Sequence, residues 1–376
     1  MSTGPISFID LKTQYQQMES AIKSRVLAVL EHGRYISGPE VTELEEKLAE
    51  FTGAKHAIAC SSGTDALLMP LMAWELGPGD AVFTTPFTFI ATAEVLSLLG
   101  VTPIFVDIDP KTFNLDPQAL EEAVQAVKRE GKLKARGVIP VDLFGLPADY
   151  DAINAIAAKH DLFVLEDTAQ GLGGIYKGRK AGNLAEVAAT SFYPAKPLGG
   201  YGDGGAIFTN DGDMAAMLRS IREHGQGVDR YHNVRLGING RLDSLQAAVL
   251  LVKLAHFPEE LDARQRVAER YSAKLQGVTV PHIPEGYRSA WAQYSVLSAK
   301  RDEVRQNLTG MDIPTVIYYI VPLHLQPVFV ARYGNQAGRF PVSERVSSQI
   351  FSLPMHPFLK EEEIDRIVEA VAKATS

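Results

Sequence analysis

The feature that most constrains the fold of this chain is an alternation of short apolar runs with longer segments of helical pattern, from about residue 54 to residue 210. The helical segments include residues 64–77, 91–100 and 149–161. Runs that are apolar on both faces and are joined by amphipathic crossovers indicate a mainly parallel sheet that is covered on both sides. The sequence therefore predicts an α/β fold. The candidate strands of the sheet are residues 56–60, 81–85, 102–108, 136–144, 162–167, 188–193 and 204–210.

The segments outside this region suggest how the chain is divided into domains. Residues 241–276 have the pattern of one or two long helices, interrupted near Pro258. We expect them to connect a large domain, residues 1–254, to a smaller α+β domain, residues 255–376. The N-terminal part of the chain is rich in helix formers and is expected to form an arm that packs against the large domain.

The composition limits the class of protein. Of the 376 residues, 46% are hydrophobic and 22% are charged, which is typical of a globular protein. The formal net charge of −8 argues against a nucleic-acid-binding surface, although a local pocket for a small anion is compatible with it. The single cysteine, Cys60, excludes an intramolecular disulfide and favours a reducing compartment. Because neither a signal-peptide pattern nor a bilayer-spanning apolar stretch is present, we expect a cytoplasmic protein without nucleic-acid or membrane partners.

The segment "ACSSGTDALL", residues 59–68, has the pattern of a strand end, a turn of small residues and the start of a helix. Free backbone N–H groups and the positive end of the helix dipole make such a turn suitable for binding a phosphate. The same pattern fits an ordinary N-capped helix, because Ser or Thr before an apolar run caps helices in many proteins.

The segment "LFVLEDTAQ", residues 162–170, delivers Glu166 and Asp167 to the carboxyl end of a predicted strand. Open α/β sheets bind their ligands at this edge. A carboxylate there can keep a heteroaromatic nitrogen protonated, since a nearby opposite charge favours the charged form. A helix cap or a pair of solvated carboxylates is the alternative interpretation of this segment alone.

The segment "TSFYPAKPLGGYGDGGAIFTND", residues 190–211, places Lys196 between Pro194 and Pro197, just after a predicted buried strand. The two prolines fix backbone φ angles close to the lysine. An isolated lysine is usually a solvated surface charge. A lysine in a desolvated or cationic site, however, can lose its proton and attack carbonyl groups.

Together, the three segments provide what pyridoxal 5'-phosphate (PLP) requires. The cofactor needs its phosphate anchored, its ring nitrogen kept protonated and its aldehyde held as a Schiff base by a lysine. The phosphate-binding turn, the carboxylate at a strand end and the constrained lysine occur in that order on the predicted sheet. We therefore expect Lys196 to carry PLP.

Several segments, in order along the chain, also carry a family resemblance: "SSGTDAL", "GPGDAVFTTPFTFIATAE", "VDLFGLPADYDAI", "EDTAQ", "SFYPAKPLGGYGDGGA", "GINGRLDSLQAA" and "FSLPMHPFL". Over essentially its full length the chain resembles the DegT–StrS family of sugar aminotransferases. The resemblance implies a PLP-dependent enzyme of the aspartate-aminotransferase fold, fold type I. It further implies a mainly parallel seven-stranded sheet and a smaller α+β C-terminal domain.

The resemblance also implies a role for each residue of the cofactor site. Lys196 would hold the cofactor as a Schiff base and move the proton during catalysis. Asp167 would pair with the pyridinium nitrogen, Gln170 would lie near the ring hydroxyl, and Phe89 would stack on the ring. The phosphate would be held by Gly63, Thr64 and Ser191.

The family resemblance extends to partners. Asn239 would reach the phosphate of the neighbouring subunit, which implies an obligate homodimer with shared active sites. The amino acceptor would be a nucleotide-linked keto-sugar, and the amino donor would be glutamate.

Two segments, "KPLGGYGDGGAIFTND" and "DRYHNVRLGINGRLDSLQAA", resemble enzymes that aminate C3 of UDP-linked 2-acetamido-3-keto-glucuronic acid in bacterial surface-polysaccharide synthesis. Arg241 is a suitable partner for the sugar carboxylate, because its planar guanidinium can bind a carboxylate bidentately. Tyr319 and His324, in "VIYYIVPLHLQP", are expected to contact the sugar. Tyr318 and Ile320 stand there in place of the family's usual histidine and proline, which leaves the exact acceptor open.

Other functions remain alternatives. The acceptor could be another UDP- or dTDP-linked 3-keto or 4-keto sugar, or the protein could be a non-catalytic regulator that binds PLP or a sugar nucleotide. A PLP-dependent sugar dehydratase is disfavoured, because that branch has histidine where this chain has Lys196. A nicotinamide-dependent oxidoreductase is disfavoured because the glycine fingerprint after the first strand is missing. His224 and His232 lie at no metal-ligand spacing, so no metal site is expected.

Overall fold

The computed structural model describes residues 4–229 and 231–376. The first three residues of the expected large domain lie outside the described residues. So does Arg230, which belongs to one of the segments that carry the family resemblance.

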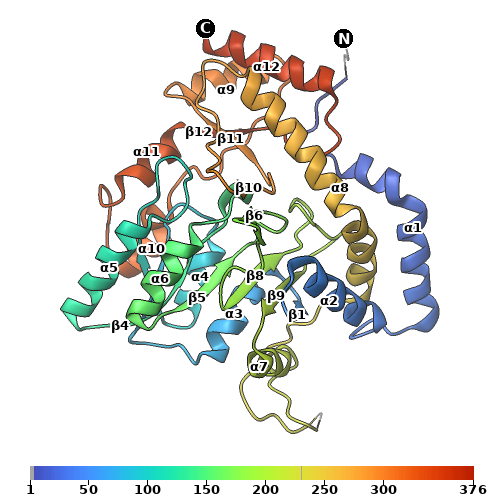
Figure 1. Ribbon diagram of the computed structural model, residues 1–376, viewed down its shortest axis with the longest axis vertical. Coiled ribbons are helices and arrows are strands. Elements are labelled where there is room, and N and C mark those ends of the chain that lie inside the picture. Colours follow the sequence, from blue (N-terminus) through green and yellow to red (C-terminus); the bar gives the residue numbers. More distant parts are fainter. Residues whose placement is uncertain (1–3, 230) are drawn as a thin grey trace.

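The predicted α/β fold is confirmed. The described chain contains a seven-stranded sheet with the strand order β1-β9-β8-β5-β4-β2-β3 (Figure 1). Strand β9 runs antiparallel to both of its neighbours, β1 and β8. All other neighbouring strands of this sheet are parallel, so the sheet is mainly parallel. The strands are β1 (His56–Cys60), β2 (Asp80–Thr84), β3 (Thr102–Phe105), β4 (Lys134–Ile139), β5 (Phe163–Asp167), β8 (Val187–Ser191) and β9 (Gly205–Thr209).

Two of the predicted strands end three or more residues earlier in the structure. In the run at residues 136–144 the strand ends at Ile139, because Pro140 has no N–H to continue the ladder. A single bridge still pairs Val141 with Asp167, and residues Leu143–Gly145 then form a 3-10 turn. The run at residues 102–108 ends as a strand at Phe105. Asp107, two residues after the end of this strand, accepts hydrogen bonds from the backbone N–H groups of Val342 and Ser343.

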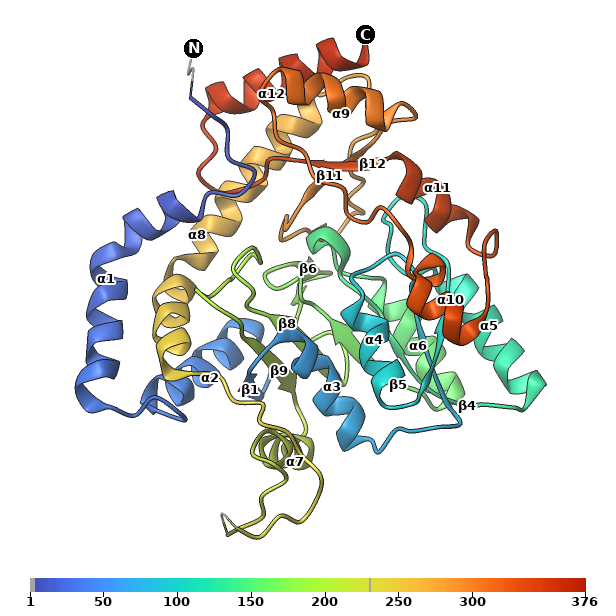
Figure 2. The same cartoon turned by 180° about the vertical axis from the view of Figure 1, so that it is seen from behind.

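Helices cover both faces of the sheet, as the apolar runs predicted. Alternate residues of a strand point to opposite faces. On β9, Ala206 and Phe208 pack with α2 and α8, whereas Ile207 packs with α3, α4 and α7 on the other side (Figure 2). Helices α5 and α6 extend the first of these layers. The helices are α2 (Pro39–Thr52), α3 (Gly63–Ala73), α4 (Ala91–Leu98), α5 (Pro117–Glu130), α6 (Tyr150–His160), α7 (Gly212–Arg222) and α8 (Ser244–Lys274).

The long helix α8 continues through Pro258, so the interruption expected there is wrong. Proline removes one backbone hydrogen bond of a helix. Buried contacts hold α8 on both sides of that position, since Phe257 and Leu261 pack in the same core as α2. On the next turn, Arg264 donates to the carbonyl groups of Trp291 and Met355.

The C-terminal elements form a separate core above the sheet (Figure 1). Its apolar residues begin on α8 at Val267 and include Ile6 from the N-terminal segment. The expected domain boundary at residues 254 and 255 lies inside α8, and this division of the chain stays a prediction. Besides α8, the elements of this core are β11 (Tyr294–Leu297), α9 (Arg301–Gly310), β12 (Ile350–Leu353) and α12 (Glu361–Thr375). Helix α10 (Pro327–Tyr333) packs instead against α4 and β3, and α11 (Pro341–Gln349) packs with Phe87 and Phe144. A small three-stranded sheet of β6 (Ile175–Tyr176), β7 (Arg179–Lys180) and β10 (Tyr287–Arg288) lies below them.

The N-terminal arm consists of α1 (Leu11–His32) followed by α2. Met18 and Ile22 of α1 pack against Val249 and Val252 of α8, which places α1 on the outside of the molecule (Figure 2). Within the described residues, no helix is long and apolar enough to cross a lipid bilayer.

Strands β4 and β5 make a close contact at Gly137, where a substitution would test the packing of the sheet. A Cβ at Gly137 would lie 2.3 Å from the ring of Phe163, and that ring stacks on Trp74 with its centroid 4.0 Å away. We expect Gly137→Ala to push Phe163 off Trp74 and to lower the free energy of unfolding by about 1–3 kcal/mol. Denaturant unfolding measures the change. Gly77→Ala is the control, because a Cβ there meets nothing within 4 Å, and equal stability of the two variants would contradict the packing argument.

Candidate active site

The three predicted segments meet at one edge of the sheet, where the parallel strands β5 and β8 end. Ser191 is the last residue of β8, and a Cβ at Gly63 would lie 2.6 Å from the Cβ of Ser191. A Cβ at Gly205 would lie 2.5 Å from the backbone oxygen of Ser62. Glycine is therefore required at both positions to bring the first turn of α3 against the end of β8.

The turn before α3 is both a helix cap and a suitable anion site, so the two interpretations of this segment are compatible. The hydroxyl of Ser62 accepts a hydrogen bond of 3.0 Å from the N–H of Asp65. Gly63 and Thr64 are the first two residues of α3, and their N–H groups have no carbonyl partner within the helix. The hydroxyl of Ser191 accepts from the N–H of Tyr193 and keeps its own proton for another acceptor.

Lys196 lies in a tightly folded turn directly after β8. Its N–H donates to the carbonyl of Tyr193 over 2.8 Å, and the N–H of Gly200 donates to the carbonyl of Phe192 over 2.7 Å. A Cβ at Gly199 would lie 2.5 Å from the carbonyl oxygen of Pro194, so the turn leaves no space for a side chain there. Burial lowers the pKa of the Lys196 amine, and the charge of Asp167 acts in the opposite direction.

Asp167, at the end of β5, is almost fully buried, with 4% of its surface exposed. Its Oδ2 accepts a hydrogen bond of 2.8 Å from the hydroxyl of Thr92, and its Oδ1 accepts one of 3.2 Å from the N–H of Ala169. Burial raises the pKa of this carboxyl, and the two hydrogen bonds and the charge of Lys196 offset only part of this rise. The carboxylate is therefore held in a fixed orientation and interacts with the lysine.

Gln170 connects this group to the C-terminal part of the chain. Its Oε1 accepts from the N–H of Phe144 over 2.6 Å, and its Nε2 donates to the hydroxyl of Tyr319 over 2.9 Å. The ring of Tyr319 lies 6.4 Å from the ring of Phe89, centroid to centroid. Phe89 is 53% exposed, so its ring is available to a ligand. The predicted residues Phe89, Gln170 and Tyr319 are thus brought together.

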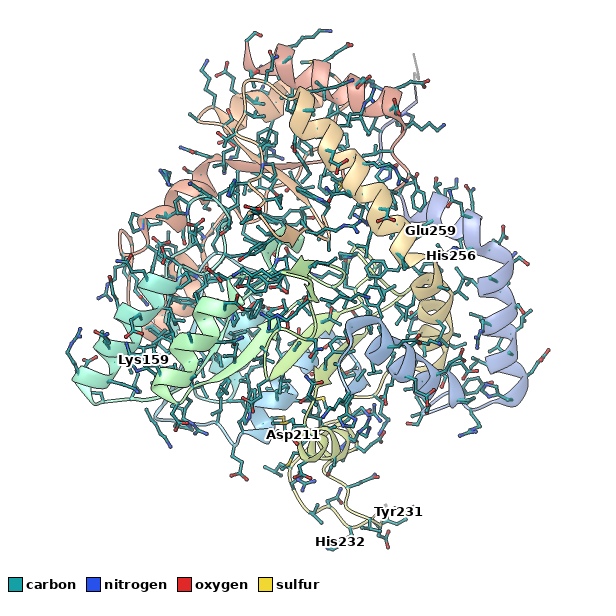
Figure 3. All side chains as sticks on the ribbon, in the orientation of Figure 1. Lys159, Asp211, Tyr231, His232, His256 and Glu259 are labelled. Atoms are coloured by element: carbon teal, nitrogen blue, oxygen red, sulfur yellow. The ribbon has the colours of Figure 1, made fainter. Side chains whose placement is uncertain are left out.

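Three other predicted residues have different surroundings. The segment that follows α7 projects from the body with Tyr231 and His232 at its tip (Figure 3). Asn239 and Arg241 lie where this segment has returned to the body, on either side of Gly240, whose carbonyl accepts a hydrogen bond of 2.9 Å from the N–H of Ser61. Asn239 is exposed. The side chain of His324 is fully buried, and its Nε2 lies 3.0 Å from Oε1 of Glu344.

Arg241 already has a carboxylate partner in this structure. Its Nη1 lies 2.9 Å from Oε2 of Glu223, and both side chains are about one quarter exposed. Its Nε is buried and has no hydrogen-bond partner among the described residues. The Nε–H of Arg241 is therefore an unsatisfied donor inside the protein.

The two residues that differ from the family pattern lie on either side of Tyr319. Tyr318 is half-buried with its ring 5.8 Å from that of Tyr319, and Ile320 is exposed. Among the described residues, no cluster of three side chains is suited to hold a metal ion.

The sequence reasoning missed Thr88 and Thr92, whose hydroxyl groups lie 3.2 Å apart behind Asp167. The signal available in the sequence was a pair of hydroxyl residues four positions apart at the start of a helical segment. That spacing places both on one side of a helix, but it gives no indication that the side faces Asp167.

The sequence placed Glu166 beside Asp167 at the end of the strand, but Glu166 lies on the opposite face of the sheet next to Asp142, which the sequence did not indicate. Glu166 points away from Asp167 and accepts hydrogen bonds from the N–H groups of Gly182 and Leu184. Asp142, fully buried, accepts from the hydroxyl of Tyr150 over 2.8 Å. Burial raises the pKa of Asp142 to about 7. Burial and the charge of Asp142 raise the pKa of Glu166, so the two carboxyl groups hold a proton that two isolated carboxylates would lose.

Comparison with known proteins identifies relatives over nearly the whole chain. The model of the DegT/DnrJ/EryC1/StrS aminotransferase family matches residues 16–372. The UDP-2-acetamido-2-deoxy-3-oxo-D-glucuronate aminotransferase of Pseudomonas aeruginosa is 48% identical over 97% of this chain and 99% of its own length.

Solved structures agree. A DegT DnrJ EryC1 StrS aminotransferase from Brucella abortus is 51% identical, with 98% of this chain and 99% of that chain covered and a TM-score of 0.96. NtdA from Bacillus subtilis, whose crystal structure contains the bound cofactor PMP, is 28% identical. The match covers 96% of this chain and 82% of that chain, with a TM-score of 0.86.

The pair of Asp142 and Glu166 generates a prediction about pH. A carboxyl whose pKa is raised by folding stabilises the folded state while it is protonated, and this stabilisation is lost as the pH rises through its folded pKa. With a folded pKa of about 7 for Asp142, the free energy of unfolding should fall by about 1 kcal/mol between pH 6 and pH 8. Asp142→Asn keeps an N–H in place of the proton and should remove most of this fall.

Thermal and denaturant unfolding at both pH values measure the effect. Asp312→Asn is the control, because Asp312 is exposed. If the pH dependence of the free energy of unfolding were unchanged in Asp142→Asn, Asp142 and Glu166 would not hold this proton.

Proposed function

Because the chain belongs to the DegT/DnrJ/EryC1/StrS aminotransferase family, we propose that it transfers the amino group of glutamate to C3 of UDP-2-acetamido-2-deoxy-3-keto-glucuronic acid. The protein is a PLP-dependent sugar aminotransferase. The observation that carries the proposed acceptor is the 48% identity, over 97% of the chain, with the Pseudomonas aeruginosa enzyme. The product would be an aminated sugar nucleotide for bacterial surface polysaccharide, including lipopolysaccharide O-antigen.

The residues at the sheet edge fit PLP. The N–H groups of Gly63 and Thr64 and the hydroxyl of Ser191 form a group of donors suited to a phosphate, and we assign it to them. Gly63 also packs so closely on Ser191 that the donors of α3 and β8 lie side by side. We assign the ring nitrogen to Asp167, whose two oxygens each accept one hydrogen bond and keep a lone pair for a further donor. We further propose that Phe89 stacks on the ring and that Gln170 lies near its hydroxyl.

When bound, the cofactor supplies an aldehyde that takes up the amino group and a protonated ring that withdraws electrons from the amino-bearing carbon. Lys196 would hold the aldehyde in the resting enzyme. Its lowered pKa favours the uncharged amine, so Nζ can accept a proton from the amino-bearing carbon of glutamate. In the second half-reaction, Nζ would return a proton to C3 of the sugar. We expect ping-pong kinetics.

Asp167 and Tyr319 would keep the other groups in place. Asp167 would hold the proton on the ring nitrogen, because a buried carboxylate favours a neighbouring positive charge. Tyr319 fixes the Gln170 amide and would limit the space on the sugar side of the site. We propose Arg241 as the partner of the sugar carboxylate, which would compete with Glu223 or bind beside it. The buried position of His324 gives no support to its assignment as a sugar contact.

We propose that the active form is a homodimer. The segment that follows α7 projects from the body with Tyr231 and His232 at its tip (Figure 3). The same segment exposes the apolar side chains of Val228, Val234 and Leu236, which a second copy would cover. Asn239 would then reach the phosphate in the neighbouring subunit. The single, buried Cys60 is consistent with a cytoplasmic location.

Amine transfer from glutamate to a panel of UDP- and dTDP-linked 3-keto and 4-keto sugars tests the proposed acceptor. The 3-keto uronic acid should give the highest kcat/KM, with 2-oxoglutarate as the second product detected by mass spectrometry. Preference for a 4-keto or a neutral sugar would support another acceptor. Cofactor uptake without transfer to any sugar would support a non-catalytic regulator.

Lys196→Ala tests the catalytic assignment. Wild-type protein should be yellow and should lose this colour with borohydride. Lys196→Ala should lose the absorbance change with glutamate and should transfer the amine at least about 100-fold more slowly. Lys177→Ala is the control, since Lys177 forms an exposed ion pair with Asp151. Full activity of Lys196→Ala would exclude the proposed role.

Arg241→Ala tests the recognition of the carboxylate. The kcat/KM for the uronic acid should fall by roughly 10- to 100-fold, the usual value of hydrogen bonds to a charged group, while a neutral UDP-linked 3-keto sugar should be much less affected. Arg235→Ala, an exposed arginine on the same segment, is the control. An equal loss with both sugars would contradict the carboxylate assignment.

A further inference from the structure

We propose that Thr92, supported by Thr88, is a positioning residue for Asp167: its hydroxyl fixes the carboxylate and keeps it ionised for the ring nitrogen of the cofactor. This inference rests on the proposed PLP site. It concerns two residues that were not among the predicted site residues, and neither of them is placed in contact with the cofactor or the sugar.

The three side chains form a buried chain of hydrogen bonds. The hydroxyl of Thr92 lies 2.8 Å from Oδ2 of Asp167, and the hydroxyl of Thr88 lies 3.2 Å from that of Thr92. The exposed fractions are 2% for Thr88, 1% for Thr92 and 4% for Asp167, so water does not compete for these contacts. We call this chain of hydrogen bonds, from Thr88 through Thr92 to Asp167, the relay; it lies inside the protein.

The chemistry of the groups fixes the direction of the bonds. An ionised carboxylate can only accept hydrogen bonds, so Thr92 must donate its single proton to Asp167. The oxygen of Thr92 can then accept from Thr88. If Asp167 were protonated, it could donate to Thr92 and the order would reverse. A donor at residue 92 thus favours the ionised form of Asp167.

The fold brings these residues together from separate elements. Thr92 is in the first turn of α4 and Thr88 precedes that helix, so the spacing of four residues places both hydroxyl groups on one side. Asp167 comes from β5 on the face of the sheet that α4 covers, because it pairs with Ala189, whose side chain packs in the same core as α4. Glu166, which precedes it, points to the opposite face.

The relay also restrains the orientation of the carboxylate. The bonds from Thr92 and from the Ala169 N–H reach different oxygens, so rotation of the carboxyl group would break both. Burial favours the neutral acid, and the positive charge of Lys196 is lost when its amine is used to hold the cofactor. Thr92 and Ala169 then remain as the neutral donors that favour the charge.

Isosteric replacement of the hydroxyl tests the inference. We expect Thr92→Val to weaken binding of PLP to the full-length apoprotein by roughly 10-fold or more, because a hydrogen bond to a charged group is lost. The pH titration of the bound chromophore should shift as well. Thr92→Ser should retain wild-type affinity and titration, since it keeps the hydroxyl. Thr88→Val should weaken binding by a smaller factor.

The control is Thr84→Val, a buried threonine whose hydroxyl donates to the carbonyl of Ile139 and which makes no contact with Asp167. It should change stability without changing cofactor affinity or the chromophore titration. Wild-type affinity and titration in Thr92→Val would overturn the inference, as would equal losses in Thr92→Val and Thr92→Ser.

Should Thr92→Val fail to fold, Thr88→Val decides the question, and unchanged binding and titration in that variant would overturn the relay. Failure of the proposed function gives a different result, because the wild-type protein itself would then take up no PLP.

Discussion

The candidate active site depends on the contacts that hold the buried carboxylate of Asp167. Burial of a carboxylate is unfavourable, and this one is maintained by one hydroxyl, one backbone N–H and a lysine. These partners come from a helix, a strand end and a turn that are distant in the sequence. The close packing of glycines at the sheet edge serves the same arrangement, since it lets the turn with Lys196 and the start of α3 approach the strand ends.

Most of the fold could be predicted because its signals are local. Each of the seven main strands gave a short apolar run, and the alternation of runs with helical segments identified the mainly parallel sheet. The errors occurred where a single residue changes backbone geometry. Pro140 ends a strand inside an apolar run, whereas Pro258 leaves a long helix uninterrupted because buried contacts hold it on both sides.

The site was predictable only in part, for a related reason. Lys196, Asp167 and the turn before α3 stand directly after strands, so topology alone places them at one edge. Thr92 becomes part of the site through the packing of α4 on β5, and Glu223 through an ion pair with Arg241 across a turn. Such contacts between side chains have no periodic pattern in the sequence. His324 shows the converse, since a polar residue in a promising segment is buried against Glu344 instead.

Helix α8 belongs to two cores at once, and this has a mechanical consequence. Its first half packs with α2 on one face of the sheet, and its second half, from Val267 onward, is part of the C-terminal core. Because α8 is a continuous helix, the C-terminal core can move relative to the sheet only if α8 bends or tilts with it. The hydroxyl of Tyr319, which follows α9, accepts a hydrogen bond from the amide of Gln170, so a tilt that reached Tyr319 would displace this contact at the candidate site.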